Sequence, residues 1–156
     1  PDAYDERTWR SKAHVNEAGE VVIPGMAFKM ALDRAAAFLS IKIPGRRNAT
    51  YTKHFQAGVL VLDNCPTGVA ADQLEPERLY VNADGVRGSG KRVWRTFPLI
   101  REWRTECSFY IADDTIPKEV FETVLGEAGK FIGIGRFRPE KGGYKGRFEV
   151  VSTAWA

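Results

Sequence analysis

The sequence predicts an α+β fold in which helices cover one face of a ferredoxin-like antiparallel sheet. A short strand pattern at 20–24 is followed by a helical pattern at 25–40. The last third repeats this order, with a strand pattern at 103–111, a helix at 117–128, a glycine-rich loop and a closing strand at 147–155. Two strand–helix halves of this kind are typical of the ferredoxin-like arrangement.

The length of the chain predicts one domain. It has 156 residues and a mass of 17.5 kDa, which is enough for a hydrophobic core. No long linker interrupts it, so we expect a single domain over 1–156 with a variable region at about 41–104. The chain begins at Pro1 and not at methionine. The N-terminus is therefore treated as incomplete, which leaves room for a missing first strand.

The first helix is predicted from its polar positions. Lys29, Asp33 and Ser40 recur at helical spacing among apolar residues, and Pro24 fixes the entry to the helix. We expect this helix to bury Phe28, Leu32, Ala35 and Leu39 and to hold Lys29 near a basic surface. Further strands are expected at 58–63, 78–83 and 93–100, and basic or turn-rich loops at 41–57 and 84–92.

The last third gives the clearest pattern. Alternate residues from Trp103 to Ile111 are apolar or small, as in a strand with one buried face. Asp113 and Asp114 read as caps of the following helix, which ends at Gly129. We expect the strands at 103–111 and 147–155 to pair in one antiparallel sheet. The side chains expected in its core are Phe109, Ile111, Val120, Val124, Leu125, Phe148 and Val150.

Positive charge is concentrated in three segments. The formal net charge is +3, but 42–53, 87–104 and 130–147 hold most of the lysines and arginines, which leaves the remainder acidic. Charge sorted in this way indicates a basic surface for an anionic partner. The alternative is that these are basic loops exposed only to water. No apolar run is long enough to span a membrane, and we expect no membrane association.

The glycine-rich segment "GIGRFRPEKGGYKG", 133–146, combines bare backbone, cations and aromatic rings. It lacks the Gly-Lys-Ser/Thr ending of a Walker P-loop. It also precedes a strand and does not open a helix, so it is not a Rossmann fingerprint. Backbone N–H groups and arginines bind phosphates, and aromatic faces stack on unpaired bases. The alternative is a surface hairpin whose rings pack into the core. The expected nucleic-acid contacts are Lys29, Arg46, Arg47, Lys53, Lys91, Arg92, Arg95, Gly133, Gly135, Arg136, Phe137, Arg138, Lys141, Gly142, Gly143, Tyr144 and Lys145.

Two stretches resemble the RAMP superfamily, the family of the Cas7 and Cas5 proteins of CRISPR effector complexes. "VVIPGMAFKMALDRAAA" resembles its "IPGSSLKGALR" element, and "GKFIGIGRFRPEKGGYKGRFEV" resembles its C-terminal glycine-rich loop. The matches cover about a quarter of the chain and occur in the family's order. Met26, Ala27 and Met30 depart from the family pattern, and the chain is short for a full Cas7 subunit.

The resemblance implies an RRM-like sheet and a Cas7-like protein that binds guide or other single-stranded RNA without catalysis. It also implies self-association or association with Cas-type subunits in antiviral defence. Cas7-like proteins insert variable elements in the region matching 41–104, including a hairpin that enters between bases of the guide. The short length suggests a compact relative, encoded by a phage or virus.

Two alternatives remain open from the sequence. One is a metal-free endoribonuclease of the Cas6-like type, in which His54 is the general base and Lys53 or Tyr51 stabilises the transition state. Proximity in sequence says little about geometry, so we favour the alternative that these three residues bind phosphate or pack locally. The other is a protein-interaction module that mimics a Cas7 subunit, in the manner of an anti-CRISPR protein.

No cofactor or metal is expected. Cys65 and Cys107 lack the spacing of a zinc site and fit free thiols in a reducing compartment, so we expect a cytoplasmic protein.

Overall fold

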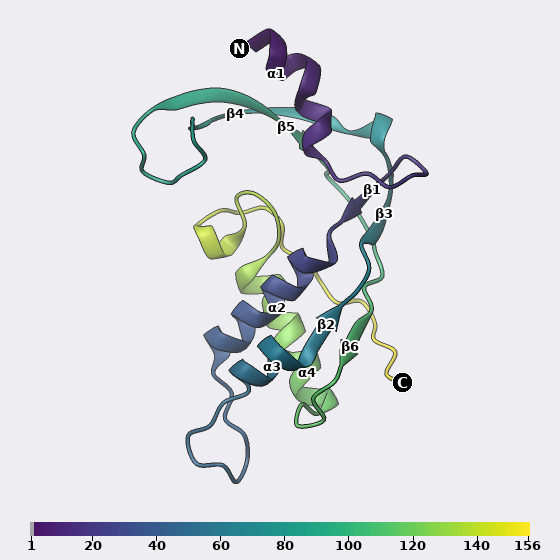
Figure 1. The fold of residues 1–156 in the computed structure, drawn as a ribbon, viewed down its shortest axis with the longest axis vertical. Helices are drawn as coiled ribbons and strands as arrows, with labels where there is room; N and C mark the ends of the chain where they lie inside the picture. Colours follow the sequence, from purple (N-terminus) through teal and green to yellow (C-terminus); the bar gives the residue numbers. More distant parts are fainter. Residues whose placement is uncertain (1) are drawn as a thin grey trace. The chain divides into compact units, whose positions relative to one another are not determined.

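The computed structural model describes residues 2–156, which divide into two compact units (Figure 1). Unit 1 comprises the chain through Ile23 together with Cys65–Glu106, and unit 2 comprises Pro24–Asn64 and Cys107–Ala156. The fold is mixed α+β with small antiparallel sheets, which confirms the predicted class at that level. No helix within residues 2–156 is long and apolar enough to cross a bilayer.

Unit 1 is built from two two-stranded sheets and a short N-terminal helix. β1 pairs with β3, and β4 pairs with β5 in continuous register from Glu75 opposite Leu99 to Asn82 opposite Arg92. Trp9, Val21 and Leu74 form its small buried cluster. Its elements are α1 (Asp2–Thr8), the 3₁₀ turn η1 (Trp9–Lys12), β1 (Glu20–Ile23), β3 (Cys65–Ala70), the 3₁₀ turn η2 (Ala71–Gln73), β4 (Glu75–Asn82) and β5 (Arg92–Leu99).

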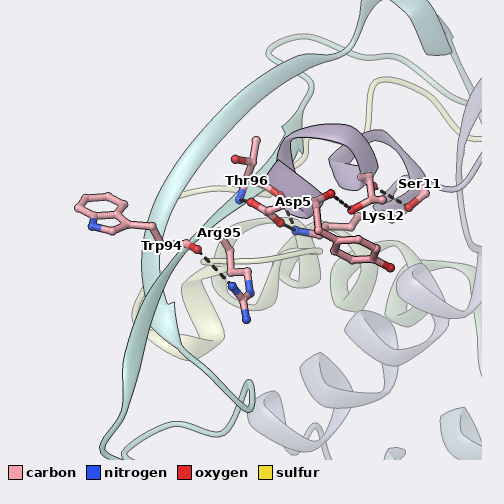
Figure 2. A network of polar contacts seen from close by, with 8 residues as sticks. Asp5, Ser11, Lys12, Trp94, Arg95 and Thr96 are labelled. Atoms are coloured by element: carbon pink, nitrogen blue, oxygen red, sulfur yellow. Dashed lines mark hydrogen bonds and ion pairs between the residues drawn. The ribbon is translucent and has the colours of Figure 1, made fainter. Parts of the chain in front are cut away.

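A buried carboxylate attaches α1 and η1 to β5 (Figure 2). Asp5 accepts the Thr96 N–H at 2.5 Å and the Lys12 ammonium at 2.8 Å, and Lys12 also donates to the Thr96 carbonyl at 2.6 Å. Burial alone raises the pKa of Asp5, but the hydrogen bonds from Lys12 and Thr96 outweigh it, so the pKa lies below its usual value. The N-terminal helix is therefore fixed to the hairpin by a fully paired charge.

Unit 2 consists of helices packed around the two-stranded sheet β2–β6. Its elements are α2 (Gly25–Leu39), α3 (Thr52–Gly58), β2 (Val59–Val61), β6 (Phe109–Ile111), α4 (Lys118–Glu127), the π-helical turn η3 (Ala128–Ile132) and the 3₁₀ turn η4 (Pro139–Lys141). The helix predicted at 25–40 is confirmed as α2, which ends where Ser40 takes a left-handed conformation. The helix α3 was not predicted, because its seven residues lie in a stretch that reads as a basic loop.

The core of unit 2 lies between α2, α3 and α4. Leu32, Phe55, Val59 and Val124 are at most 1% exposed. The ring of Phe55 stacks on that of Phe121, with centroids 6.2 Å apart. Each such side chain contributes roughly 1.5–3 kcal/mol by leaving water, so the helical packing stabilises the unit more than its three-residue strands do. The expected burial of Phe28, Leu32 and Ala35 is confirmed, and Leu39 is half-buried.

The predicted pairing of 103–111 with 147–155 is wrong. Within the first segment only Phe109–Ile111 forms a strand, and its partner is β2, with Leu60 opposite Tyr110. Residues 147–156 form no strand. Phe148 explains why: its N–H donates to the Gly129 carbonyl and its ring packs edge-on against Phe28, at 5.4 Å between centroids.

The alternate apolar side chains of these two segments are therefore covered by packing against the core, without strand pairing between the segments. Val124 and Leu125 are buried as expected. Phe109, Ile111, Val120, Phe148 and Val150 are half-buried against the same core. A continuous ferredoxin-like sheet is not present; the strands of residues 2–156 form three separate pairs.

Candidate nucleic-acid interface

Lys29, expected on the basic surface, is buried in unit 2. Its ammonium contacts Asp33 at 2.7 Å and donates to the carbonyls of Phe55 and Gln56 at 2.6 and 3.1 Å. Burial is the largest influence on Asp33 and raises its pKa, and the contact with Lys29 offsets this only in part. Lys29 therefore joins α2 to the end of α3, and its charge does not face solvent.

The basic segment 42–53 is exposed, but it does not adjoin the glycine-rich loop. Arg46, Arg47 and Lys53 are all exposed, and Arg47 has a φ of 52° at the tip of the loop between α2 and α3. In Figure 1 this loop and the glycine-rich loop project from opposite ends of unit 2. The expectation that 133–146 crosses a surface shared with 42–53 and Lys29 is therefore not met.

The backbone of the glycine-rich loop forms hydrogen bonds within the loop itself. Ile134 N–H donates to Gly146, and Lys145 N–H donates to Phe137, at 3.0 and 2.9 Å. A Cβ at Gly146 would lie 1.8 Å from the Ile134 carbonyl oxygen, and one at Gly143 would lie 1.7 Å from that of Phe137. These glycines are needed because two backbone segments touch. N–H groups that were expected to reach phosphate, including those of Gly133, Gly142 and Gly143, donate within the chain.

The arginines of the loop differ in their exposure and contacts. Arg138 contacts Glu140 at 3.3 Å and donates to the Gly135 carbonyl, and Arg34 of α2 reaches the same Glu140 oxygen at 2.9 Å. This carboxylate holds the loop against α2. Arg136 is exposed, as is Lys141 in η4.

Two aromatic rings flank a lysine on the outer side of the loop. The Lys145 ammonium lies 5.9 Å from the centroids of both Phe137 and Tyr144. Tyr144 is 79% exposed, and Phe137 is 41% exposed with a φ of 53°. A positive φ at a bulky residue is strained and persists only where surrounding contacts impose it. The loop thus holds a cation between two accessible rings.

The β4–β5 hairpin of unit 1 carries a longer stack of the same kind. Tyr80 and Trp94 are directly opposite in the ladder, with centroids 5.3 Å apart. Arg78 lies over the Trp94 ring at 5.3 Å and Arg92 over the Tyr80 ring at 4.7 Å. Both rings remain about half exposed, and Figure 2 shows the Trp94 ring directed away from the Asp5 contact. We call Arg78, Trp94, Tyr80 and Arg92 the hairpin stack.

Three of the contacts expected from the sequence, Lys91, Arg92 and Arg95, lie in this hairpin, and only Arg92 belongs to the stack. Arg92 also donates to the Tyr80 carbonyl at 2.5 Å, which fixes its guanidinium. Arg95 is half-buried, and Lys91 is exposed next to the turn. Arg78 lies 3.8 Å from Asp2, both largely exposed, a contact of little energetic weight.

Sequence reasoning missed Arg78, Tyr80 and Trp94. Their signal was present, because alternate residues of two paired strands share one face. To place these three side chains on one face, however, the register between β4 and β5 must be known, and the sequence pattern does not give it.

A histidine and an aspartate meet in unit 2. His54 Nδ1 lies 2.6 Å from Asp113 Oδ2, and the other oxygen of Asp113 accepts the Thr115 N–H at 2.9 Å. The hydrogen bond from His54, followed by that from Thr115, lowers the pKa of Asp113 to about 2. Asp113 was predicted to cap the next helix, but α4 begins at Lys118 after Pro117 and has no side-chain cap. Tyr51 is buried, at 5% exposure.

No protein family, no curated protein and no solved structure matches this chain. Within residues 2–156 no group of histidine, cysteine or acidic side chains is arranged to hold a metal ion.

Proposed function

We propose that this protein binds single-stranded nucleic acid, RNA in the first instance, through exposed faces that combine aromatic rings with cations. The hairpin stack is the observation that carries the proposal. Soluble proteins place most large aromatic side chains in the core, whereas Tyr80 and Trp94 are held side by side with about half of each ring accessible.

An unpaired base fits such a face for physical reasons. Every base has a flat π-surface, and stacking on an aromatic side chain contributes about 1–3 kcal/mol per base. The guanidinium groups of Arg78 and Arg92 lie at the two ends of the stack, where they neutralise the phosphates on either side of a stacked base. A regular duplex keeps its bases stacked on each other, so the proposed ligand is a single strand.

The glycine-rich loop offers a smaller face of the same composition. Lys145 between Phe137 and Tyr144 supplies one cation and two rings on a backbone fixed by its own hydrogen bonds. A preordered loop loses less conformational entropy when it binds than a flexible one does. The resemblance to Cas7-like proteins points the same way, since it covers this loop and implies a base-contacting hairpin in the region that holds β4 and β5. Guide RNA and Cas-type subunits are the partners that this resemblance proposes.

A salt titration with matched variants tests the proposal. Labelled single-stranded RNA of mixed sequence is titrated with wild type, with Tyr80→Ala/Trp94→Ala, and with Phe38→Ala/Phe131→Ala. The last pair is a control: its rings are 5.6 Å apart, and the two residues are 63% and 49% exposed. Wild-type affinity should fall with salt at a log–log slope of about −0.7 per neutralised phosphate. The hairpin variant should bind at least about 10-fold more weakly at an unchanged slope, because stacking releases no counterions.

The result against the proposal is equally specific. If wild type binds neither single-stranded RNA nor single-stranded DNA at low salt, the protein-interaction alternative replaces nucleic-acid binding. If both double variants lose affinity equally, the hairpin stack is not the site. A parallel titration with DNA of the same sequence shows whether the 2′-hydroxyl contributes.

A further inference from the structure

The pair of His54 and Asp113 has a geometry that the proposed binding function does not use. His54 lies on α3 and Asp113 follows β6, so residues far apart in sequence meet at 2.6 Å. The approach is fixed by backbone, because Ala112 N–H donates to the Gly58 carbonyl at 2.8 Å. Thr115 N–H holds the second carboxylate oxygen.

This arrangement determines the tautomer of a neutral imidazole. A carboxylate only accepts hydrogen bonds, so a neutral His54 places its proton on Nδ1 and leaves the lone pair on Nε2. No second partner of His54 is recorded within residues 2–156, and its side chain is 17% exposed. A base oriented by a carboxylate, with its other nitrogen directed elsewhere, is the combination that general-base catalysis requires.

The neighbouring residue Lys53 supplies an exposed cation. Lys53 precedes His54 on α3 and is exposed, whereas the Lys29 ammonium is engaged by Asp33 and two carbonyls. Tyr51, the other stabiliser expected from the sequence, is buried in the core of unit 2. Lys53 is therefore the side chain placed to attract a phosphate to this part of α3.

We propose that His54, positioned by Asp113, acts as a general base that cleaves bound single-stranded RNA. The proposal rests on the proposed function and departs from the expectation of binding without catalysis. His54 Nε2 takes the proton of a 2′-hydroxyl, and the 2′-oxygen attacks the adjacent phosphorus. The bond from phosphorus to the 5′-oxygen breaks, and that oxygen takes a proton from water. The products are a 2′,3′-cyclic phosphate and a 5′-hydroxyl, and His54 returns its proton to the solvent.

The test measures cleavage and binding on the same samples. End-labelled single-stranded RNA and a DNA of the same sequence are incubated in EDTA with wild type, His54→Ala, His54→Gln and Asp113→Asn. His14→Ala is the matched control, since His14 is exposed and lies in unit 1. Thermal melting identifies any variant that does not fold.

The expected results separate chemistry from folding. Wild type cuts RNA to cyclic-phosphate ends and leaves DNA intact. Loss of His54 lowers the rate at least about 100-fold, within the range of general acid–base catalysis, and added imidazole restores part of the rate to His54→Ala. Asp113→Asn lowers kcat with little change in KM, because it alters the tautomer of His54 and not the contacts of the strand. His14→Ala cleaves like wild type.

Other outcomes overturn the proposal in distinguishable ways. RNA binding without cleavage refutes the catalytic role and leaves the binding function intact. Cleavage that survives loss of His54 with equal rate identifies another base or a contaminant. If the protein neither binds nor cleaves RNA, both proposals are refuted.

Discussion

The hairpin of unit 1 and the glycine-rich loop of unit 2 contain the same residue types but use their charge differently. In the loop, Arg138 is held by Glu140, which also binds Arg34 of α2. In the hairpin, Arg78 and Arg92 lie over exposed aromatic rings. The loop uses much of its positive charge to fold itself, and the hairpin presents its charge beside stacking surfaces.

This difference teaches that basic residues counted along a sequence do not locate a binding surface. Lys29 belongs to the segment with the clearest family resemblance, yet its ammonium is enclosed by α2 and α3. Whether a cation faces a carboxylate or an aromatic ring decides what it can still bind. The predictions below separate cations and glycines that stabilise the fold from groups that contact a ligand.

The largest effect is expected from Lys29→Met. The substitution leaves the half-buried Asp33 carboxylate and two carbonyls without their shared donor, so unfolding free energy should fall by about 3 kcal/mol. Urea denaturation measures it. RNA affinity, compared under conditions where the variant stays folded, should not change. If the folded variant bound RNA more weakly than wild type, Lys29 would belong to the binding surface after all.

Gly146→Ala should rank second. The new Cβ meets the Ile134 carbonyl and occupies a backbone with a φ of 82°, so we expect a loss of about 2–3 kcal/mol. Gly135→Ala is the matched control, since its φ is 78° but nothing lies within 4 Å of its Cβ. It should lose only about 1 kcal/mol in the same denaturation experiment. Equal losses would show that the close backbone approach has no role.

Single aromatic substitutions should show whether the hairpin stack or the glycine-rich loop contributes more to RNA affinity. Trp94→Ala removes one of the two rings of the hairpin stack and should weaken RNA binding by about 2 kcal/mol. Tyr144→Ala removes a ring of the smaller face on the glycine-rich loop and should weaken it by about 1 kcal/mol. Fluorescence anisotropy at fixed salt gives both values. A larger loss at Tyr144 would make the loop, and not the hairpin, the principal site.

The matched arginine substitutions Arg92→Gln and Arg138→Gln test where charge is available. Arg92→Gln should reduce the magnitude of the salt slope by about 0.7, the value for one phosphate on a single strand. Arg138→Gln should leave the slope unchanged, because its guanidinium is held by Glu140 and the Gly135 carbonyl. Titrations between low and moderate salt decide it. A flattened slope for Arg138→Gln would contradict the assignment of that side chain to the fold.

The smallest effect concerns acid stability and the His54–Asp113 contact. Because the pKa of Asp113 is lowered to about 2, the carboxylate stabilises the fold above its usual pKa near 3.8. This contribution disappears as the pH falls through about 2. Asp113→Asn should therefore be less stable than wild type at pH 5, and the difference should vanish near pH 2. Thermal melts at both pH values measure it, and an equal difference at both would exclude the carboxylate as its cause.

Sequence reasoning located local structure well and long-range pairing poorly. The helix at 25–39 and the hairpin strands were predictable, because helical and alternating periodicity is a property of neighbouring residues. The sheet between 103–111 and 147–155 failed because apolar alternation shows which face is covered and not what covers it. In the structure Phe28 and the η3 turn cover Phe148.

The candidate site shows the same limit. The residue types of the glycine-rich loop indicated nucleic-acid contacts, but the pattern did not reveal that Gly143 and Gly146 allow backbone to touch backbone. The meeting of His54 with Asp113 joins residues 59 positions apart, which no local pattern encodes.

The division of the chain into two units has a consequence for its synthesis. The chain passes from one unit to the other after Ile23, after Asn64 and after Glu106, so neither unit is a continuous stretch. Once Glu106 has emerged from the ribosome, every segment of unit 1 is available, while α2 and α3 of unit 2 still lack α4, which packs against α2. Phe55 and the apolar face of α2 therefore remain uncovered until Phe121 and Val124 emerge. The half-made protein exposes apolar surface at this stage, and it is then that chaperones would be needed most.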